Sequence, residues 1–289
     1  MNAPLTSAVN VSGEQPIGAI LMAAGRLRAD ENEQILRLQR EKGLRFGDAA
    51  LQLGVVTTTD IDYAMARQFD YPYLQRGKSN VSMSVVAAYS PFCAQSEALR
   101  ALRSQLMLRW FNPQAGRKML AVVSAQPGEG RSWMAANLAV MFAQLGERTL
   151  LVDADLRRPA QHKLFGVDNR SGLSSLLHGR AVPDAIRWLP DLRMLAVLPA
   201  GVLPPNPQEL LARPSLGMLL HQYAASFDVI IIDTPAGEDC ADGMMVAVRA
   251  KGVLMVARPH VSRVASVRRY ARRLNEAGVG LAGSVINGD

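Results

Sequence analysis

Hydrophobic and polar positions form two patterns along the chain. From about residue 96, short apolar runs alternate with longer amphipathic segments. Runs that are apolar throughout are typical of a parallel sheet covered on both faces, and helices are expected between them. The pattern predicts an α/β fold, a doubly wound and mostly parallel sheet. The predicted strands are Met119–Ser124, Thr149–Asp153, Met194–Leu198, Val229–Asp233, Gly252–Val256 and Ala282–Ile286, with helices such as Trp133–Leu145 and Val264–Glu276.

The N-terminal part has a mainly helical pattern. Residues 1–15 are small and polar and are expected to be a flexible tail. Residues 16–76 are expected to form a small helical domain with a weak internal repeat. Each copy predicts a short helix, a glycine that ends it, and a longer helix that ends in glutamine. The repeated residues are Gly18, Gly25 and Gln39 in the first copy and Gly47, Gly54 and Gln68 in the second.

The two patterns are separated by a polar, irregular stretch. Residues 77–95 contain glycine, serine, asparagine and proline and are expected to be a linker. Residues 96–289 are then expected to form the α/β domain. At about 150 residues per domain, a total of 289 residues predicts about two domains.

Composition narrows the class of protein. Hydrophobic residues make up 49% and charged residues 20%, which is typical of a globular chain. No apolar run approaches the ~18 residues that span a bilayer, and residues 1–14 do not resemble a secretory signal. Two cysteines are too few for a disulfide framework or a zinc site. A cytoplasmic protein is expected.

The positive charge is concentrated in one window. The net charge is +7, but residues 249–273 contain eight basic residues and no acid, so the rest of the chain sums to −1. This distribution does not indicate a nucleic-acid-binding protein. The window includes the predicted helix Val264–Glu276, whose outer face is either solvated or a docking face for acidic residues or anionic lipid. Its expected buried stripe is Val264, Val267, Ala271 and Leu274, and Arg268, Arg269, Arg272 and Arg273 lie off it.

The strongest chemical signal lies between the first predicted strand and the following helix. Residues 120–132 read Leu-Ala-Val-Val-Ser-Ala-Gln-Pro-Gly-Glu-Gly-Arg-Ser. Such a loop directs backbone N–H groups at phosphate oxygens, and the helix adds its positive end. Ala125 and Arg131 replace the usual first glycine and lysine, so a simple strand-to-helix turn is the alternative. The candidate nucleotide-binding residues are Gln126, Pro127, Gly128, Glu129, Gly130, Arg131, Ser132 and Trp133.

Three carboxylates follow two other predicted strands. Asp153 and Asp155 end one strand, and Asp233 ends another. Ligands of parallel α/β sheets bind at the carboxyl ends of the strands. Mg²⁺ takes one or two carboxylates together with phosphate oxygens and water. A single aspartate in this place is more often a helix cap, but the three together with the loop predict a nucleotide and metal site.

Residues from about 90 to 289 resemble the bacterial P-loop tyrosine kinases that act with polysaccharide chain-length determinants. They are most similar to the EpsG-type kinases of exopolysaccharide operons. Five blocks occur in the family's order, which makes the resemblance specific. They are Ser124–Ser132 as Walker A, Asp153–Arg157 as Walker A′, Ile230–Pro235 as Walker B, Pro204–Leu211 as the loop that precedes a helix, and Glu97–Arg103 as the Glu-x-x-Arg-x-x-Arg helix.

The resemblance implies ATP and Mg²⁺ as cofactors and a role for each matching residue. Ser132 and Asp155 would hold Mg²⁺, and Asp233 would order its water shell. Asp153 would help to activate the attacking phenol, with Arg131 in the place of the catalytic lysine. Glu97, Arg100 and Arg103 would join subunits into a ring. The implied partner is the cytosolic segment of a membrane chain-length determinant, which would recruit the protein to the inner face of the membrane.

Two departures from the family leave alternatives open. Arg131 replaces the Walker lysine, and these two side chains are not interchangeable at a phosphate. The family usually ends in a tyrosine-rich tail, but the last tyrosine here is Tyr270. The interpretations are therefore a tyrosine kinase, an ATP-dependent switch without phosphotransfer, and a partition-type positioning ATPase. Gln126, at the position of that last family's second lysine, argues against the third.

Residues 16–76 resemble the N-terminal domain of type II secretion and pilus ATPases. Some of these domains bind cyclic di-GMP through a repeated Arg-Leu-Gly…Gly…Gln pattern. The second copy fits with Arg45, Gly47, Gly54 and Gln68, whereas the first has Pro16 in place of the arginine. Cyclic di-GMP binding is one interpretation, and a docking or packing role is the other.

Overall fold

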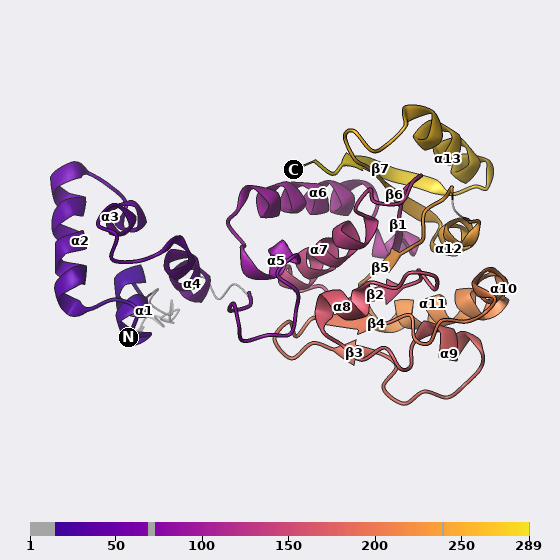
Figure 1. Ribbon diagram of the computed structural model, residues 1–289, viewed down its shortest axis with the longest axis horizontal. Coiled ribbons are helices and arrows are strands. Elements are labelled where there is room, and N and C mark those ends of the chain that lie inside the picture. The colour runs from indigo at the N-terminus through magenta and orange to yellow at the C-terminus, as the bar shows by residue number, and fades with distance from the viewer. Residues whose placement is uncertain (1–14, 69–72, 239, 289) are drawn as a thin grey trace, which may run out of the picture. The chain divides into compact units, whose positions relative to one another are not determined.

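In the computed structural model, the chain divides into two compact units, within residues 1–71 and 72–289. The structure describes residues 15–68, 73–238 and 240–288. Apart from Gln15, the tail predicted for residues 1–15 lies outside the described residues. Figure 1 shows the helices and strands of both units, which are described one at a time below.

The first unit is helical, as predicted. Gly25 and Gly54 follow the two short helices, each with a φ of +67°. Glycine enters this left-handed region at little cost, so each residue ends its helix and turns the chain toward the longer one. Ile35, Ala49 and Ala64 are fully buried between the helices. The helices are α1 (Ile17–Ala23), α2 (Ala29–Lys42), α3 (Phe46–Gln52) and α4 (Thr58–Gln68).

The second unit is built on a seven-stranded sheet in the order β3-β4-β2-β5-β1-β6-β7. All neighbouring strands are parallel except β3, which is antiparallel to β4. This confirms the predicted doubly wound and mostly parallel sheet. Sequence reasoning missed β3 because two residues do not form an apolar run. The strands are β1 (Met119–Val123), β2 (Thr149–Asp153), β3 (Arg187–Trp188), β4 (Leu195–Leu198), β5 (Val229–Asp233), β6 (Gly252–Ala257) and β7 (Gly280–Ile286).

Helices cover both faces of this sheet. The cluster on one face includes Phe142 and Leu151, and the cluster on the other includes Leu150 and Leu211. Neighbouring residues of one strand thus enter opposite layers, as the pleat of a sheet requires. On the first face lie α5 (Val86–Tyr89), α6 (Ala94–Arg109), α7 (Arg131–Gln144) and α8 (Gln161–Phe165). The second carries α9 (Leu173–Leu177), α10 (Pro207–Ala212), α11 (Pro214–Ser226), α12 (Asp242–Ala250) and α13 (Val264–Glu276).

The linker predicted for residues 77–95 was wrong, because this segment packs into the second unit. The backbone N–H of Ala87 donates to Asn137 Oδ1 over 2.9 Å, and the Gln144 side chain donates to the Ala87 carbonyl. Val85 is fully buried in the same core. The glycines and serines give the segment the composition of a linker, but it also contains enough apolar residues to pack against α7.

Helix α13 differs partly from its prediction. Its four outward arginines are exposed as expected. Val264 was predicted to be buried but is 65% exposed, whereas Tyr270 and Leu274 are buried at 2% each. The buried residues of α13 are Ser266, Tyr270 and Leu274, so the buried face includes the positions just before Val267 and Ala271, which are themselves half-buried. The basic face remains open to both interpretations.

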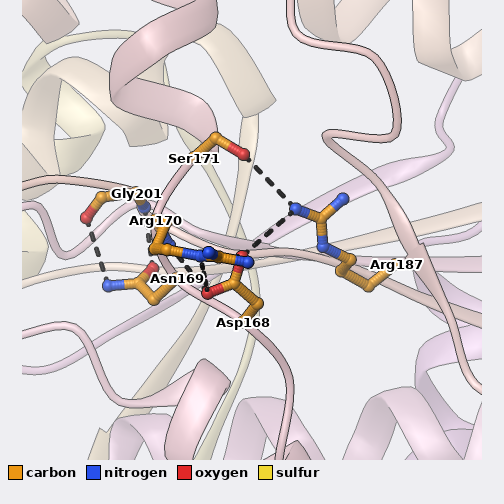
Figure 2. Close-up of polar contacts among 6 residues, drawn as sticks. All are labelled: Asp168, Asn169, Arg170, Ser171, Arg187 and Gly201. Atoms are coloured by element: carbon orange, nitrogen blue, oxygen red, sulfur yellow. Dashed lines mark hydrogen bonds and ion pairs between the residues drawn. The ribbon is translucent and has the colours of Figure 1, made fainter.

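Polar contacts join the loop after α8 to the loop after β4. Asn169 binds Gly201 in both directions, donating to its carbonyl over 3.1 Å and accepting from its N–H over 2.8 Å. Figure 2 shows these contacts, with Arg187 reaching toward Ser171 and Asp168. They hold both loops beside the carboxyl end of the sheet. No helix in the described part of the chain is both long and apolar enough to span a bilayer.

Candidate active site

The predicted phosphate loop and the predicted carboxylates meet at one edge of the sheet. Strand β5 lies between β1 and β2, and Asp153 is directly opposite Asp233 in the parallel register. Residues 124–130 follow β1 at the same end. The sheet order therefore brings the three motifs together although they are up to about a hundred residues apart.

The phosphate loop has the shape that its glycines predict. Gly128 and Gly130 have φ values of +80° and +91°, which side chains other than glycine rarely adopt. Gly130 is the residue before α7, and Arg131, Ser132 and Trp133 form the first turn. Free backbone N–H groups at this helix start make an anion-binding site.

Glu129 supports the loop from inside rather than facing a ligand. Its side chain is fully buried, and Oε2 accepts a 2.8 Å hydrogen bond from the Gln126 N–H. Its other oxygen accepts from the Ser262 hydroxyl. Asn287 donates to the Glu129 carbonyl over 3.1 Å. Sequence reasoning missed Ser262 and Asn287, because nothing local marks a partner more than 130 residues away.

The Arg131 side chain is bound to the protein itself. Its Nε donates to the Thr234 carbonyl over 2.8 Å, and Nη1 donates to the Gln126 carbonyl over 3.0 Å. Nη1 also donates to the Ser124 hydroxyl. The guanidinium therefore joins the phosphate loop to the segment after β5. A lysine, with one ammonium group, cannot reproduce this fork.

The three carboxylates are buried at this edge. Asp153 and Asp233 are 0% exposed and Asp155 is 4% exposed. Burial, followed by the negative charge of Asp233, holds the pKa of Asp153 well above its usual range. Burial also raises the pKa of Asp233 to about 6, although the Ser132 and Gln161 side chains oppose the shift. Positive charge at this site would lower both pKa values.

The first two aspartates also shape the loop that they begin. Asp153 Oδ2 accepts from the N–H groups of Ala160 and Gln161 at 3.0 and 2.9 Å. Asp155 Oδ1 accepts from the N–H of Arg158 over 2.9 Å. The turn is thus closed by its own carboxylates, which holds Asp155 close to Asp153.

An ion pair fixes the far side of this loop. Arg157 Nε and Nη2 donate to the two Asp242 oxygens at 2.8 and 3.2 Å. Asp242 is fully buried, whereas the Arg157 side chain is 41% exposed. This two-point contact joins the loop after β2 to the start of α12.

Gln161 is a site residue that sequence reasoning missed. It is fully buried at the start of α8, and its Nε2 donates to Asp233 Oδ2 over 2.7 Å. The same nitrogen donates to the Ser132 carbonyl over 3.1 Å. One glutamine in a helix start carries no signal of its own, so only the structure could reveal it.

The residues present fit Mg²⁺ bound together with a nucleotide. Ser132, Asp155 and Asp233 offer oxygen atoms, which hard cations prefer. Asp233 Oδ1 is buried and has no hydrogen-bond partner in the described structure. Within the described residues, no cluster of three His, Cys, Asp or Glu could hold a metal alone. The set therefore suits an ion that phosphate oxygens and water complete.

The residues predicted to join subunits lie on α6. Arg100 contacts Glu97 and the Pro91 carbonyl. Arg103 Nη1 donates to the Met141 carbonyl on α7 over 2.9 Å. The Glu97 side chain is 63% exposed, but that of Arg100 is only 21% exposed. Both arginines contact their own chain, and the ring stays a prediction.

Comparison with known proteins gives the class of this fold and site. Residues 116–288 match the ParA family, described as NUBPL iron-transfer P-loop NTPase. The chain is 33% identical to the tyrosine-protein kinase YwqD of Bacillus subtilis over 73% of this chain and 88% of YwqD. It is 36% identical to the putative tyrosine-protein kinase EpsB of Ralstonia solanacearum over 66% of this chain, but spans only 25% of EpsB.

A solved structure agrees with these relatives. The kinase domain of the Escherichia coli tyrosine kinase ETK superimposes with a TM-score of 0.68 and 31% identity. The match covers 76% of this chain and 85% of that domain. The fold and the loop define a ParA-type P-loop NTPase. Within that class, the chain belongs to the bacterial tyrosine-protein kinase family.

Proposed function

We propose that the protein is an ATP-dependent protein-tyrosine kinase that regulates exopolysaccharide chain length or export. The observation that carries this proposal is the meeting of the phosphate loop with Asp153, Asp155 and Asp233 at the sheet edge. Its partner would be the cytosolic segment of a membrane chain-length determinant, which would recruit a ring of subunits to the inner face of the membrane.

The residues divide the reaction between them. Backbone N–H groups of residues 128–132 would hold the phosphates, and Ser132, Asp155 and Asp233 would hold Mg²⁺ directly or through water. Bound Mg²⁺ neutralises charge on the transferred phosphoryl group. A phenol with a pKa of ~10 needs a proton acceptor at neutral pH. Asp153 suits this role because burial raises its pKa and so strengthens it as a base.

The distribution of tyrosines favours a substrate on another protein. Tyr63, Tyr89 and Tyr270 are buried, with exposures of 9%, 4% and 2%. Tyr73 and Tyr223 are half-buried, and Tyr71 lies outside the described residues. Burial raises the pKa of Tyr270 to about 12, which makes its phenol a still poorer nucleophile. The described structure thus offers no fully exposed tyrosine for transfer between copies.

Arg131 supports the second candidate, an ATP-binding switch with weak or no phosphotransfer. Its Nε and Nη1 are engaged by Thr234, Gln126 and Ser124 rather than directed at a phosphate. Nucleotide could still change the shape of the loop through these contacts. A partition-type positioning ATPase is the third candidate, and ATP-dependent DNA binding, which we do not expect, would support it.

A phosphotyrosine assay separates the first two candidates. The chain is incubated with Mg·ATP and a synthetic glutamate–tyrosine copolymer, with and without the cytosolic partner segment. Phosphotyrosine that forms with the natural chain and disappears with Asp155→Ala supports the kinase. Equal signal from both proteins would exclude it. Mg·ATP binding without phosphotyrosine under any of these conditions would favour the switch.

The first unit keeps a separate prediction. The repeat residues Gly18, Gln39 and Gln68 line one cleft with a volume of about 540 Å³. Arg45, from the predicted cyclic di-GMP pattern, is exposed at the start of α3. The ParA match covers residues 116–288 and does not extend to this unit. Cyclic di-GMP binding therefore has no support from the comparisons, and calorimetry with the dinucleotide would test it.

A further inference from the structure

Gln161 connects three elements of the candidate phosphoryl-transfer site. Its backbone N–H donates to Asp153 Oδ2 over 2.9 Å, next to the end of β2. Its side-chain Nε2 donates to Asp233 Oδ2 over 2.7 Å and to the Ser132 carbonyl over 3.1 Å. These acceptors belong to β2, β5 and the first turn of α7. Gln161 is fully buried, so water does not compete for these contacts.

The hydrogen bonds determine which way the carboxamide points. Both acceptors of Nε2 are oxygens that cannot donate to it, since one is a carbonyl and the other a carboxylate. The NH₂ end must therefore face Ser132 and Asp233, and the carbonyl end must face away from them. Gln161 Oε1 is buried and has no hydrogen-bond partner among the described residues.

A second buried oxygen without a partner lies on the residue that Gln161 contacts. Asp233 Oδ1 is also buried and unpaired in the described structure. A buried acceptor without a donor costs roughly 1–3 kcal/mol, so two of them on contacting residues require an explanation. Both are acceptors, so a group that donates hydrogen bonds would satisfy both. Water molecules bound to a cation are strong donors of this kind.

We propose that Gln161 is a positioning residue for Mg²⁺, which it holds in place through Asp233 and through the waters of the ion. Its NH₂ group keeps the Asp233 carboxylate and the Ser132 turn in one arrangement, and its Oε1 accepts from a metal-bound water. This proposal rests on the proposed nucleotide site but not on kinase activity. Second-layer contacts of this type typically change metal affinity 10- to 100-fold.

Calorimetry of ADP binding with and without Mg²⁺ tests the proposal without turnover. The measured quantity is the dissociation constant of ADP without Mg²⁺ divided by that with Mg²⁺. A larger ratio means that the metal strengthens nucleotide binding more. Gln161→Glu has nearly the same shape but adds a fourth carboxylate to the site, in contact with Asp233. We expect its ratio to fall at least tenfold, with metal-free ADP affinity unchanged within about threefold.

A matched control keeps the chemistry and moves it away from the site. Gln144 lies at the other end of α7, and its Nε2 donates to the Ala87 carbonyl over 2.9 Å. Gln144→Glu should leave the ratio unchanged. An unchanged ratio in Gln161→Glu, or equal losses with and without Mg²⁺, would overturn the proposal and indicate a purely structural glutamine.

A second variant covers the case in which Gln161→Glu does not fold. Gln161→Asn keeps both polar groups but is one methylene shorter. In the natural protein with ADP, the electron paramagnetic resonance spectrum of bound Mn²⁺ should show an ordered site that Gln161→Asn broadens or loses. The same spectrum in both proteins would contradict the proposal. A natural protein without metal-dependent ADP binding would instead overturn the nucleotide site itself.

Discussion

The Asn287 side chain covers Gly130 so closely that a methyl group at Gly130 would lie 2.0 Å from Asn287 Nδ2. Asn287 follows directly after β7, and the same nitrogen donates to the Glu129 carbonyl. The end of the last strand thus closes one side of the phosphate loop. This contact, together with a φ of +91°, requires glycine at position 130.

Gly130→Ala should therefore weaken nucleotide binding. The alanine is strained at this φ by about 1–2 kcal/mol, and its Cβ also displaces Asn287 or the loop. Calorimetry should show at least a tenfold loss of ADP affinity. Gly146→Ala is the matched control, because Gly146 has a φ of +97° but nothing within 4 Å of an added Cβ. It should lose stability and keep its affinity. Normal binding by Gly130→Ala would contradict the close packing.

Arg131→Ala should destabilise the protein even without nucleotide. Its guanidinium holds the phosphate loop to the Thr234 carbonyl, and such charge-assisted bonds contribute about 1.5–3 kcal/mol each, though not additively. We expect the free energy of unfolding in urea to fall by about 2 kcal/mol. Arg170→Ala should change it little, since that side chain is 89% exposed. If Arg131 acted only on phosphates, the nucleotide-free variant would be as stable as the natural protein.

The raised pKa of Asp233 predicts how stability depends on pH. Burial raises this pKa to about 6, above the ~3.9 of an unfolded aspartate. Between these values the unfolded chain releases the proton first, so this contribution to stability is lost as pH rises from about 4 to 6. Asp233→Asn, which carries no charge, should therefore be more stable than the natural protein at pH 7.5 by about 2–3 kcal/mol. The difference should shrink toward pH 4.

Asp228 supplies the opposite case for that experiment. Its hydrogen bond from Arg148 lowers the pKa of this carboxyl, so its contribution is present at neutral pH and lost on acidification. Asp228→Asn should therefore be slightly less stable than the natural protein at pH 7.5. Urea unfolding at several pH values checks both signs. If both variants changed the free energy of unfolding at pH 7.5 in the same direction, the opposite pKa shifts of Asp233 and Asp228 would be refuted.

Arg157→Ala should be more harmful than removal of the whole ion pair. The variant leaves the Asp242 carboxylate fully buried without its two-point partner, at a cost of about 2–4 kcal/mol. Adding Asp242→Asn removes the buried charge and should restore part of the loss. A double-mutant cycle in urea measures the coupling. Additive effects would show that the pair does not couple the two loops.

The sequence predicts much of the second unit because its signals are local. Apolar runs marked six of the strands, and the predicted helix Val264–Glu276 has the bounds observed for α13. The phosphate loop and the three aspartates could be predicted because each of these motifs lies at the end of an apolar strand. Asp153 and Asp233 lie opposite each other as the parallel order requires.

The remaining features depend on contacts that no local pattern contains. Residues 77–95 have the composition of a linker, yet Ala87 bonds to Asn137 fifty residues away. Ser262 contacts Glu129 because the fold brings the segment after β6 to the phosphate loop. Gln161 matters because a turn places it between two strands and a helix. The side chain of Arg131 could be recognised as unusual, but its partner Thr234 could not be foreseen.

Because of the position of Trp133, intrinsic tryptophan fluorescence can report on the candidate site. This half-buried indole is in the first turn of α7, directly after Ser132. The other two tryptophans lie elsewhere, with Trp110 against Gly252 and Trp188 stacked on Phe227. A ligand that binds the phosphate loop changes the surroundings of Trp133 but not those of the other two tryptophans. Trp133→Phe then identifies the responsive signal, so that occupancy can be followed in real time without a label.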